Sequence, residues 1–149
     1  MTNWQIVIKD EMALAGDSLV SLLNVVTSDW RDSVVRVYHL EGSFDPRSIQ
    51  RSVGSSAVPT AEFASCIRGK AQIDWATLLV ARDSSLGLPE QVGRELVPTL
   101  VDGLVLVRAV DGTFMDVATN SPTMREKIVK AYPSGRVSEV ADGDVEWPE

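Results

Sequence analysis

The sequence offers few side chains for catalysis. His39 is the only histidine and Cys66 the only cysteine, so a Ser-His-Asp or Cys-His arrangement would have to use His39. His39 falls in an apolar, β-prone run, and Cys66 shares a helical face with Phe63 and Ile67. We interpret His39 as a hydrogen-bonded structural residue and Cys66 as a packed thiol. One cysteine and one histidine do not make a usual zinc ligand set, and the sequence predicts no catalytic residue, metal or cofactor.

Acidic residues gather at the C-terminal end of the chain. The net charge of the 149 residues is −7, and residues 139–149 hold an aromatic side chain among carboxylates. Trp commonly anchors protein interfaces, and carboxylates steer a basic partner. The alternative is that Trp147 folds back on the core while the acids only solvate the terminus. The candidate partner-binding residues are Glu139, Asp142, Asp144, Glu146 and Trp147.

A second candidate site is the irregular stretch 43–60, which is long for a loop in a compact domain. Two arginines and a glycine that frees backbone N–H groups are typical of an anion-binding loop. The stretch has neither a P-loop lysine nor a dinucleotide fingerprint, so an ordinary surface loop is the competing interpretation. The candidate ligand-binding residues here are Arg47, Arg51, Gly54, Ser55 and His39.

Between residues 104 and 119 two β-prone runs flank Asp111-Gly112, a strong hairpin signal. A two-residue turn places Arg108 opposite Met115 and makes both faces largely apolar, which predicts a hairpin covered on both sides. In that register Arg108 and Asp116 point to opposite faces. Each then needs its own partner, at a sheet margin, in a structural ion pair or in a pocket.

The remaining periodicity predicts strands at 4–9, 34–40, 73–82 and 136–140, and helices after Asp17, Thr60, Pro89 and Ser121. We expect an α+β fold with one mainly antiparallel sheet of five to six strands and three to four helices. The central hairpin at 104–119 is expected beside the strands around Val7, Val37 and Leu79. Residues 1–140 are expected to form one globular domain and residues 141–149 an acidic tail.

Composition narrows the class of protein. No apolar run is long enough to span a membrane and the start does not resemble a secretory signal, so we expect a cytoplasmic protein. No basic footprint for nucleic acid is visible. We expect a non-catalytic domain that neutralises or docks a basic protein partner, by analogy an immunity or inhibitor protein acting on a bacterial toxin. The alternatives are a small enzyme or ligand-binding domain that holds an anionic substrate near residues 43–60, and homo-oligomerisation through a sheet edge.

Overall fold

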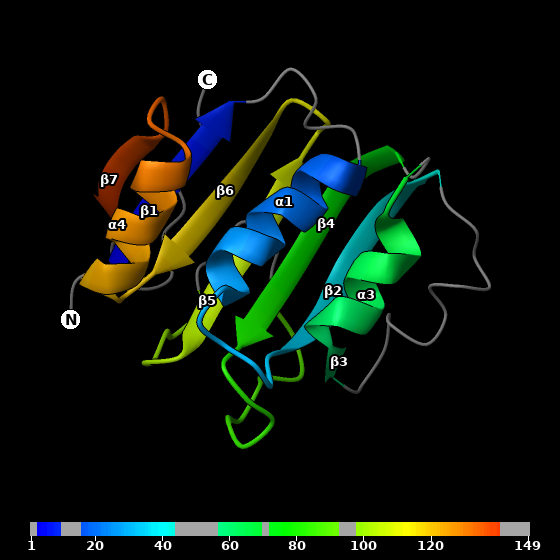
Figure 1. Cartoon of the computed structure of the whole chain (residues 1–149), viewed down its shortest axis with the longest axis horizontal. Coiled ribbons are helices and arrows are strands. Elements are labelled where there is room, and N and C mark those ends of the chain that lie inside the picture. Colours follow the sequence, from blue (N-terminus) through cyan, green and yellow to red (C-terminus); the bar gives the residue numbers. More distant parts are fainter. Residues whose placement is uncertain (1–2, 10–15, 44–56, 70–71, 93–97, 141–149) are drawn as a thin grey trace.

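The computed structural model describes residues 3–9, 16–43, 57–69, 72–92 and 98–140. Its centre is one antiparallel seven-stranded sheet with the order β3-β2-β4-β5-β6-β1-β7 (Figure 1). The strands are β1 (Asn3–Lys9), β2 (Val34–Ser43), β3 (Val58–Pro59), β4 (Gln72–Ala81), β5 (Leu104–Val110), β6 (Phe114–Thr119) and β7 (Arg136–Val140). The described helices are α1 (Gly16–Thr27), α3 (Thr60–Ile67) and α4 (Pro122–Ala131). The α+β class is as predicted, and the sheet is larger because the two-residue β3 is too short to show a period.

All three helices lie on one face of the sheet (Figure 1). Each helix turns an apolar stripe toward the strands, and this burial holds the two layers together. Ser121 caps α4 by accepting a hydrogen bond from the Met124 amide at 3.2 Å, and Pro122 follows it in the first turn. The largest buried side chains of this core are Ile6, Ile8, Leu19, Leu22, Leu23, Phe63, Ile67, Ile73 and Leu78.

The opposite face of the sheet is also covered. Val92 and Leu100, from the chain between β4 and β5, pack against Leu79 and Leu106. The predicted helix beginning at Pro89 is wrong for the described residues up to Val92, which contain no helix.

Two β2 side chains hold residues 89 and 90 instead. Arg36 donates to the carbonyls of Pro89 (2.9 Å) and Glu90 (3.1 Å), and Tyr38 donates to Pro89 (2.6 Å). A β-bulge between Val37 and His39 breaks the alternation here. These non-local bonds compete with helix formation, and the local spacing of leucine and valine does not reveal them.

The hairpin of β5 and β6 is buried along its whole length on both faces, as predicted. Its predicted register is wrong by one residue. Three residues separate Val110 from its partner Phe114, and Asp111 (φ 52°) and Gly112 (φ 64°) take left-handed conformations in the turn. A one-residue change moves every side chain of β6 to the other face. Arg108 therefore lies opposite Asp116, on the same face of the sheet.

Candidate functional site

The predicted partner-binding residues begin on β7, an edge strand of the sheet. Glu139 lies on this strand and is exposed. The other four predicted residues, Asp142, Asp144, Glu146 and Trp147, lie outside the described residues. The structure therefore places the start of the acidic segment at a sheet edge, where, among the described residues, only β1 pairs with the strand.

A groove runs beside this edge, between α4 and β7. Its volume is about 470 Å³, and its apolar lining comes from Val129 and Val137. Val137 is 40% exposed, one of two large hydrophobic residues in the described chain with that degree of exposure. An exposed apolar side chain next to an open strand edge is a common feature of interaction surfaces.

Two cations and one carboxylate line the groove, so its own net charge is +1. Arg125, Glu126 and Lys130 line it, and the guanidinium of Arg125 lies 4.5 Å from the centre of the Trp4 ring. Glu126 precedes Lys130 by one helical turn, the spacing of a favourable ion pair. The groove itself thus supplies apolar contact, and the net negative charge comes from the sequence that follows β7.

The second predicted site is only partly described. His39 lies on β2, half-buried, with its Nε2 atom 3.2 Å from the carbonyl oxygen of Val92. This contact agrees with a hydrogen-bonded structural histidine. Its four predicted companions, Arg47, Arg51, Gly54 and Ser55, lie outside the described residues.

A buried polar cluster on the second face was missed by the sequence reasoning. Arg108 donates from Nε to Asp116 Oδ1 (2.8 Å) and from Nη2 to Asp116 Oδ2. Gln5 Nε2 donates to the same carboxylate at 2.7 Å. All three residues are fully buried, and Gln5 Oε1 has no hydrogen-bond partner. The signal in the sequence was the pair of opposite charges equidistant from the turn, which a three-residue loop brings together.

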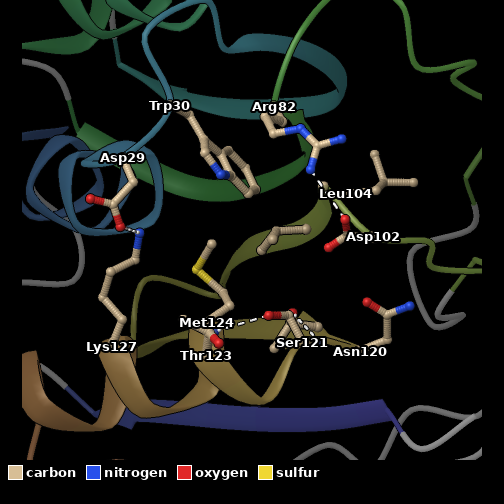
Figure 2. A pocket seen from close by; sticks show the side chains of 13 residues that line it. Asp29, Trp30, Arg82, Asp102, Leu104, Asn120, Ser121, Thr123, Met124 and Lys127 are labelled. Atoms are coloured by element: carbon tan, nitrogen blue, oxygen red, sulfur yellow. Dashed lines mark hydrogen bonds and ion pairs between the residues drawn. The ribbon is translucent and has the colours of Figure 1, made fainter.

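A small pocket opens at the end of the sheet where β5 begins and α4 starts (Figure 2). Its volume is about 230 Å³, and Trp30 and Met124 contribute apolar walls. Two ion pairs lie at its sides, Lys127 with Asp29 (3.4 Å) and Arg82 with Asp102 (3.1 Å). All four of these charged residues line the pocket. Because each cation is paired with a carboxylate, the pocket has no electrostatic preference for an anion or a cation.

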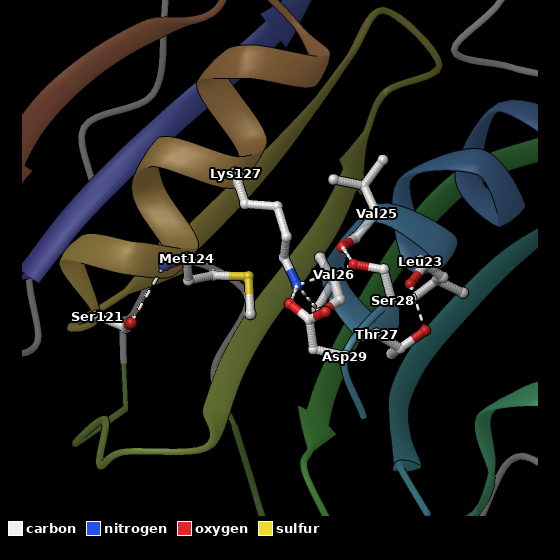
Figure 3. A network of polar contacts seen from close by, with 9 residues as sticks. All are labelled: Leu23, Val25, Val26, Thr27, Ser28, Asp29, Ser121, Met124 and Lys127. Carbon is white, nitrogen blue, oxygen red and sulfur yellow. Dashed lines mark hydrogen bonds and ion pairs between the residues drawn. The ribbon is translucent and has the colours of Figure 1, made fainter. Parts of the chain in front are cut away.

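Lys127 in this pocket has a structural role (Figure 3). Its ammonium donates to the carbonyl of Val26 (3.0 Å) and to the hydroxyl of Ser28 (3.2 Å), at the C-terminal end of α1. A cation there satisfies a helix carbonyl and the helix dipole together. Lys127 thus ties α4 to α1.

In the part of the chain that the structure describes, Tyr38 and Asp83 have shifted pKa values. Burial raises the pKa of Tyr38, and the nearby Arg36 guanidinium lowers it less. Hydrogen bonds from the hydroxyl and amide of Ser85 hold the pKa of Asp83 below its usual value. Tyr38 therefore stays a neutral donor to Pro89 over the ordinary pH range.

The described residues contain no group of three His, Cys, Asp or Glu side chains placed to hold a metal ion. No helix in the described part of the chain has the length and apolarity needed to cross a membrane. Comparison with known proteins finds no matching family model, curated protein or solved structure.

Proposed function

We propose that this protein is a non-catalytic binding domain that docks a basic protein partner at the β7 edge and at the acidic residues 139–149. The observation that carries the proposal is the open edge of β7, with exposed Val137 beside an apolar groove, leading directly into the acidic segment. In this proposal the partner is a toxin, and the protein acts as its immunity or inhibitor protein. We place the encounter in the cytoplasm, because a chain with one cysteine forms no internal disulfide.

The sheet edges support β7 rather than β3 as the docking strand. β3 has only two residues, one of which is Pro59, whereas β7 has five residues. A proline has no amide to donate to an added strand. A partner strand at β7 would gain main-chain hydrogen bonds, and the groove would receive one of its side chains.

The charge of the C-terminal segment supplies the preference for a basic partner. Acidic residues concentrated next to a contact surface raise the rate of encounter with a basic protein, and salt screens this effect. Binding should therefore weaken as ionic strength rises. The negative charge of this segment also repels acidic proteins, and this repulsion makes binding specific for basic partners.

The test begins with a photo-cross-linking amino acid at position 137, with position 74 on the exposed part of β4 as the control. The protein captured at 137 is identified, purified and titrated at two salt concentrations. We expect a basic protein whose association slows at higher salt. The triple charge reversal of Asp142, Asp144 and Glu146 to Lys should weaken binding at least about tenfold, while reversal of the exposed Asp32, Glu62 and Asp74 should not.

The proposal fails if the captured protein binds independently of salt, or if both triple variants behave alike. Self-association is a separate outcome, because cross-linking at 137 to a second copy would make β7 a homodimer contact. Sedimentation of the purified protein measures this directly.

A second candidate function, the binding of an anionic ligand near residues 43–60, is favoured by one observation. A cavity lined by two arginines lies between α1 and α3, next to Pro59 and Thr60 at the end of that stretch. A concave basic site is what such a function requires.

A further inference from the structure

The groove between α1 and α3 contains an unpaired buried hydroxyl. The cavity has a volume of about 310 Å³, and Thr60, the first residue of α3, lines it. Thr60 is 5% exposed, and its Oγ1 atom has no hydrogen-bond partner. A buried hydroxyl without a partner costs free energy, and native proteins rarely keep one without a reason.

The N-terminus of α3 adds unsatisfied donors at the same place. The residue before the helix is Pro59, which offers no side-chain cap. The amide of Thr60 itself is used, because it donates to the carbonyl of Ser33 at 3.1 Å. The following turn therefore presents backbone amides and the positive end of the helix dipole without a capping side chain from residue 59.

Two arginines give the groove its charge. Arg31 precedes Ser33 by two residues, and the bond between Ser33 and Thr60 holds that loop against the start of α3. Arg68 lines the groove at the other end of α3. The exposed acids nearest in sequence, Asp32 and Glu62, do not line it.

We propose that this groove binds a phosphoryl group, held by Arg31, by the Thr60 hydroxyl and by the first-turn amides of α3. Phosphate oxygens accept from a helix N-terminus and from a guanidinium at once. An anion seated there would give Thr60 the acceptor that it lacks. Asn24 and Thr27 of α1 line the adjoining wall, where the remainder of a phosphorylated small molecule would lie.

This inference rests on the second of the two proposed functions and is independent of partner docking. The probe is inorganic phosphate, with chloride at equal ionic strength as the control, and the readouts are thermal unfolding and isothermal titration. If the dissociation constant is about 1 mM, 20 mM phosphate should raise Tm by about 4–7 °C. Adenosine monophosphate in a parallel titration shows whether an organic remainder adds affinity.

Variants assign the binding to this groove. Arg31→Met should weaken phosphate binding by about 10–100-fold, because it removes a charge-assisted donor. Thr60→Val keeps the shape of the side chain, so it should weaken binding while leaving Tm without phosphate unchanged or higher. Arg82→Met, which changes an arginine that does not line the groove, should bind like the wild type.

The outcomes separate this site from the function on which it rests. If phosphate raises Tm but Arg31→Met and Thr60→Val bind normally, the protein binds anions elsewhere and this site is wrong. If phosphate and chloride act alike on the wild type, both the site and the anionic-ligand function are wrong.

Discussion

Breaking the buried ion pair of β5 and β6 should destabilise the protein more than any surface substitution. The side chains of Arg108 and Asp116 are 0% and 1% exposed, and the carboxylate accepts two bonds from the guanidinium. Removing Arg108 leaves the Asp116 carboxylate buried without its cation, and removing Asp116 takes from Arg108 the carboxylate that accepts two of its bonds. Breaking a buried pair in this way costs about 3–5 kcal/mol. We therefore expect Arg108→Met and Asp116→Leu each to lose about that amount.

The double variant is the sharper test. Replacing both residues by apolar side chains of similar size removes both buried charges, and such exchanges are often neutral or stabilising. Asp116→Leu also takes the acceptor from Gln5 Nε2, which adds about 1 kcal/mol. Arg108→Met with Asp116→Leu should therefore recover to within about 1–2 kcal/mol of the wild type, and adding Gln5→Met should recover most of the remainder.

Urea unfolding followed by circular dichroism measures these differences. The total stability of such a domain is about 5–15 kcal/mol, so each single variant should unfold at a clearly lower urea concentration. Thermal melts should fall by about 6–20 °C at this chain length. The reasoning is refuted if either single variant costs less than about 1 kcal/mol, or if the double variant loses the sum of the two.

Three further predictions concern other contacts, and the first two include a control substitution. Lys127→Met should cost about 1–2 kcal/mol in urea melts, because the C-terminal end of α1 loses its cation, whereas Lys130→Met on the exposed side of α4 should change stability by less than about 0.5 kcal/mol. Gly42→Ala should cost more than about 2 kcal/mol, since its Cβ would lie 1.9 Å from a β4 carbonyl oxygen. Gly69→Ala, where the φ of +88° is strained but nothing lies within 4 Å, should cost only about 1 kcal/mol. Tyr38 should make stability fall at alkaline pH: its folded-state pKa lies above the unfolded 10.0, so its contribution is complete below pH 10 and is lost as the pH rises through the folded value. Unfolding of Tyr38→Phe should lack this alkaline decline, and an identical decline in both proteins would rule out the assignment.

The parts of the fold that the sequence predicts are those set by local period. The apolar stripe from Leu19 to Val26 places α1, and the runs around Val7 and Leu79 place two strands next to the hairpin. The strand around Val37 lies one position further out, beyond β4. The spacing of apolar residues identifies a helix or strand, but the order of strands in a sheet depends on packing between distant segments.

The hairpin shows most clearly how far the fold can be predicted from the hydrophobic pattern alone. Asp111-Gly112 fits loops of two or three residues, and both loops bury apolar side chains on each face. Because neither face of the hairpin is polar, a shift of one residue in the strand pairing exposes no apolar side chain, and the hydrophobic pattern does not determine the register. The choice comes from Arg108 and Asp116, because only the three-residue loop brings the two charges together in the interior. Opposite charges placed symmetrically about a turn are therefore evidence for a register.

The candidate sites were predictable to different degrees. The final strand at 136–140 was predicted from the sequence and is present as β7, with Glu139 exposed on it; the role of Glu139 in partner binding stays a prediction. The α4–β7 groove and the Arg31–Thr60 groove were not predictable, since each forms between elements whose contact the sequence does not encode locally.

Coverage of the sheet on both faces limits where this protein can recognise anything through its backbone. The five residues of β7 offer one side of a strand, and the buried Asp116 carboxylate already accepts from Arg108 and Gln5. Recognition by the sheet must then occur at its edge, where main-chain bonds give affinity without sequence preference. Under the proposed docking, selectivity would come from what adjoins the edge, which is the groove around Val137 and the acidic residues beyond Glu139. A partner that matched the strand but not the charge would bind slowly, and one that matched only the charge would dissociate quickly.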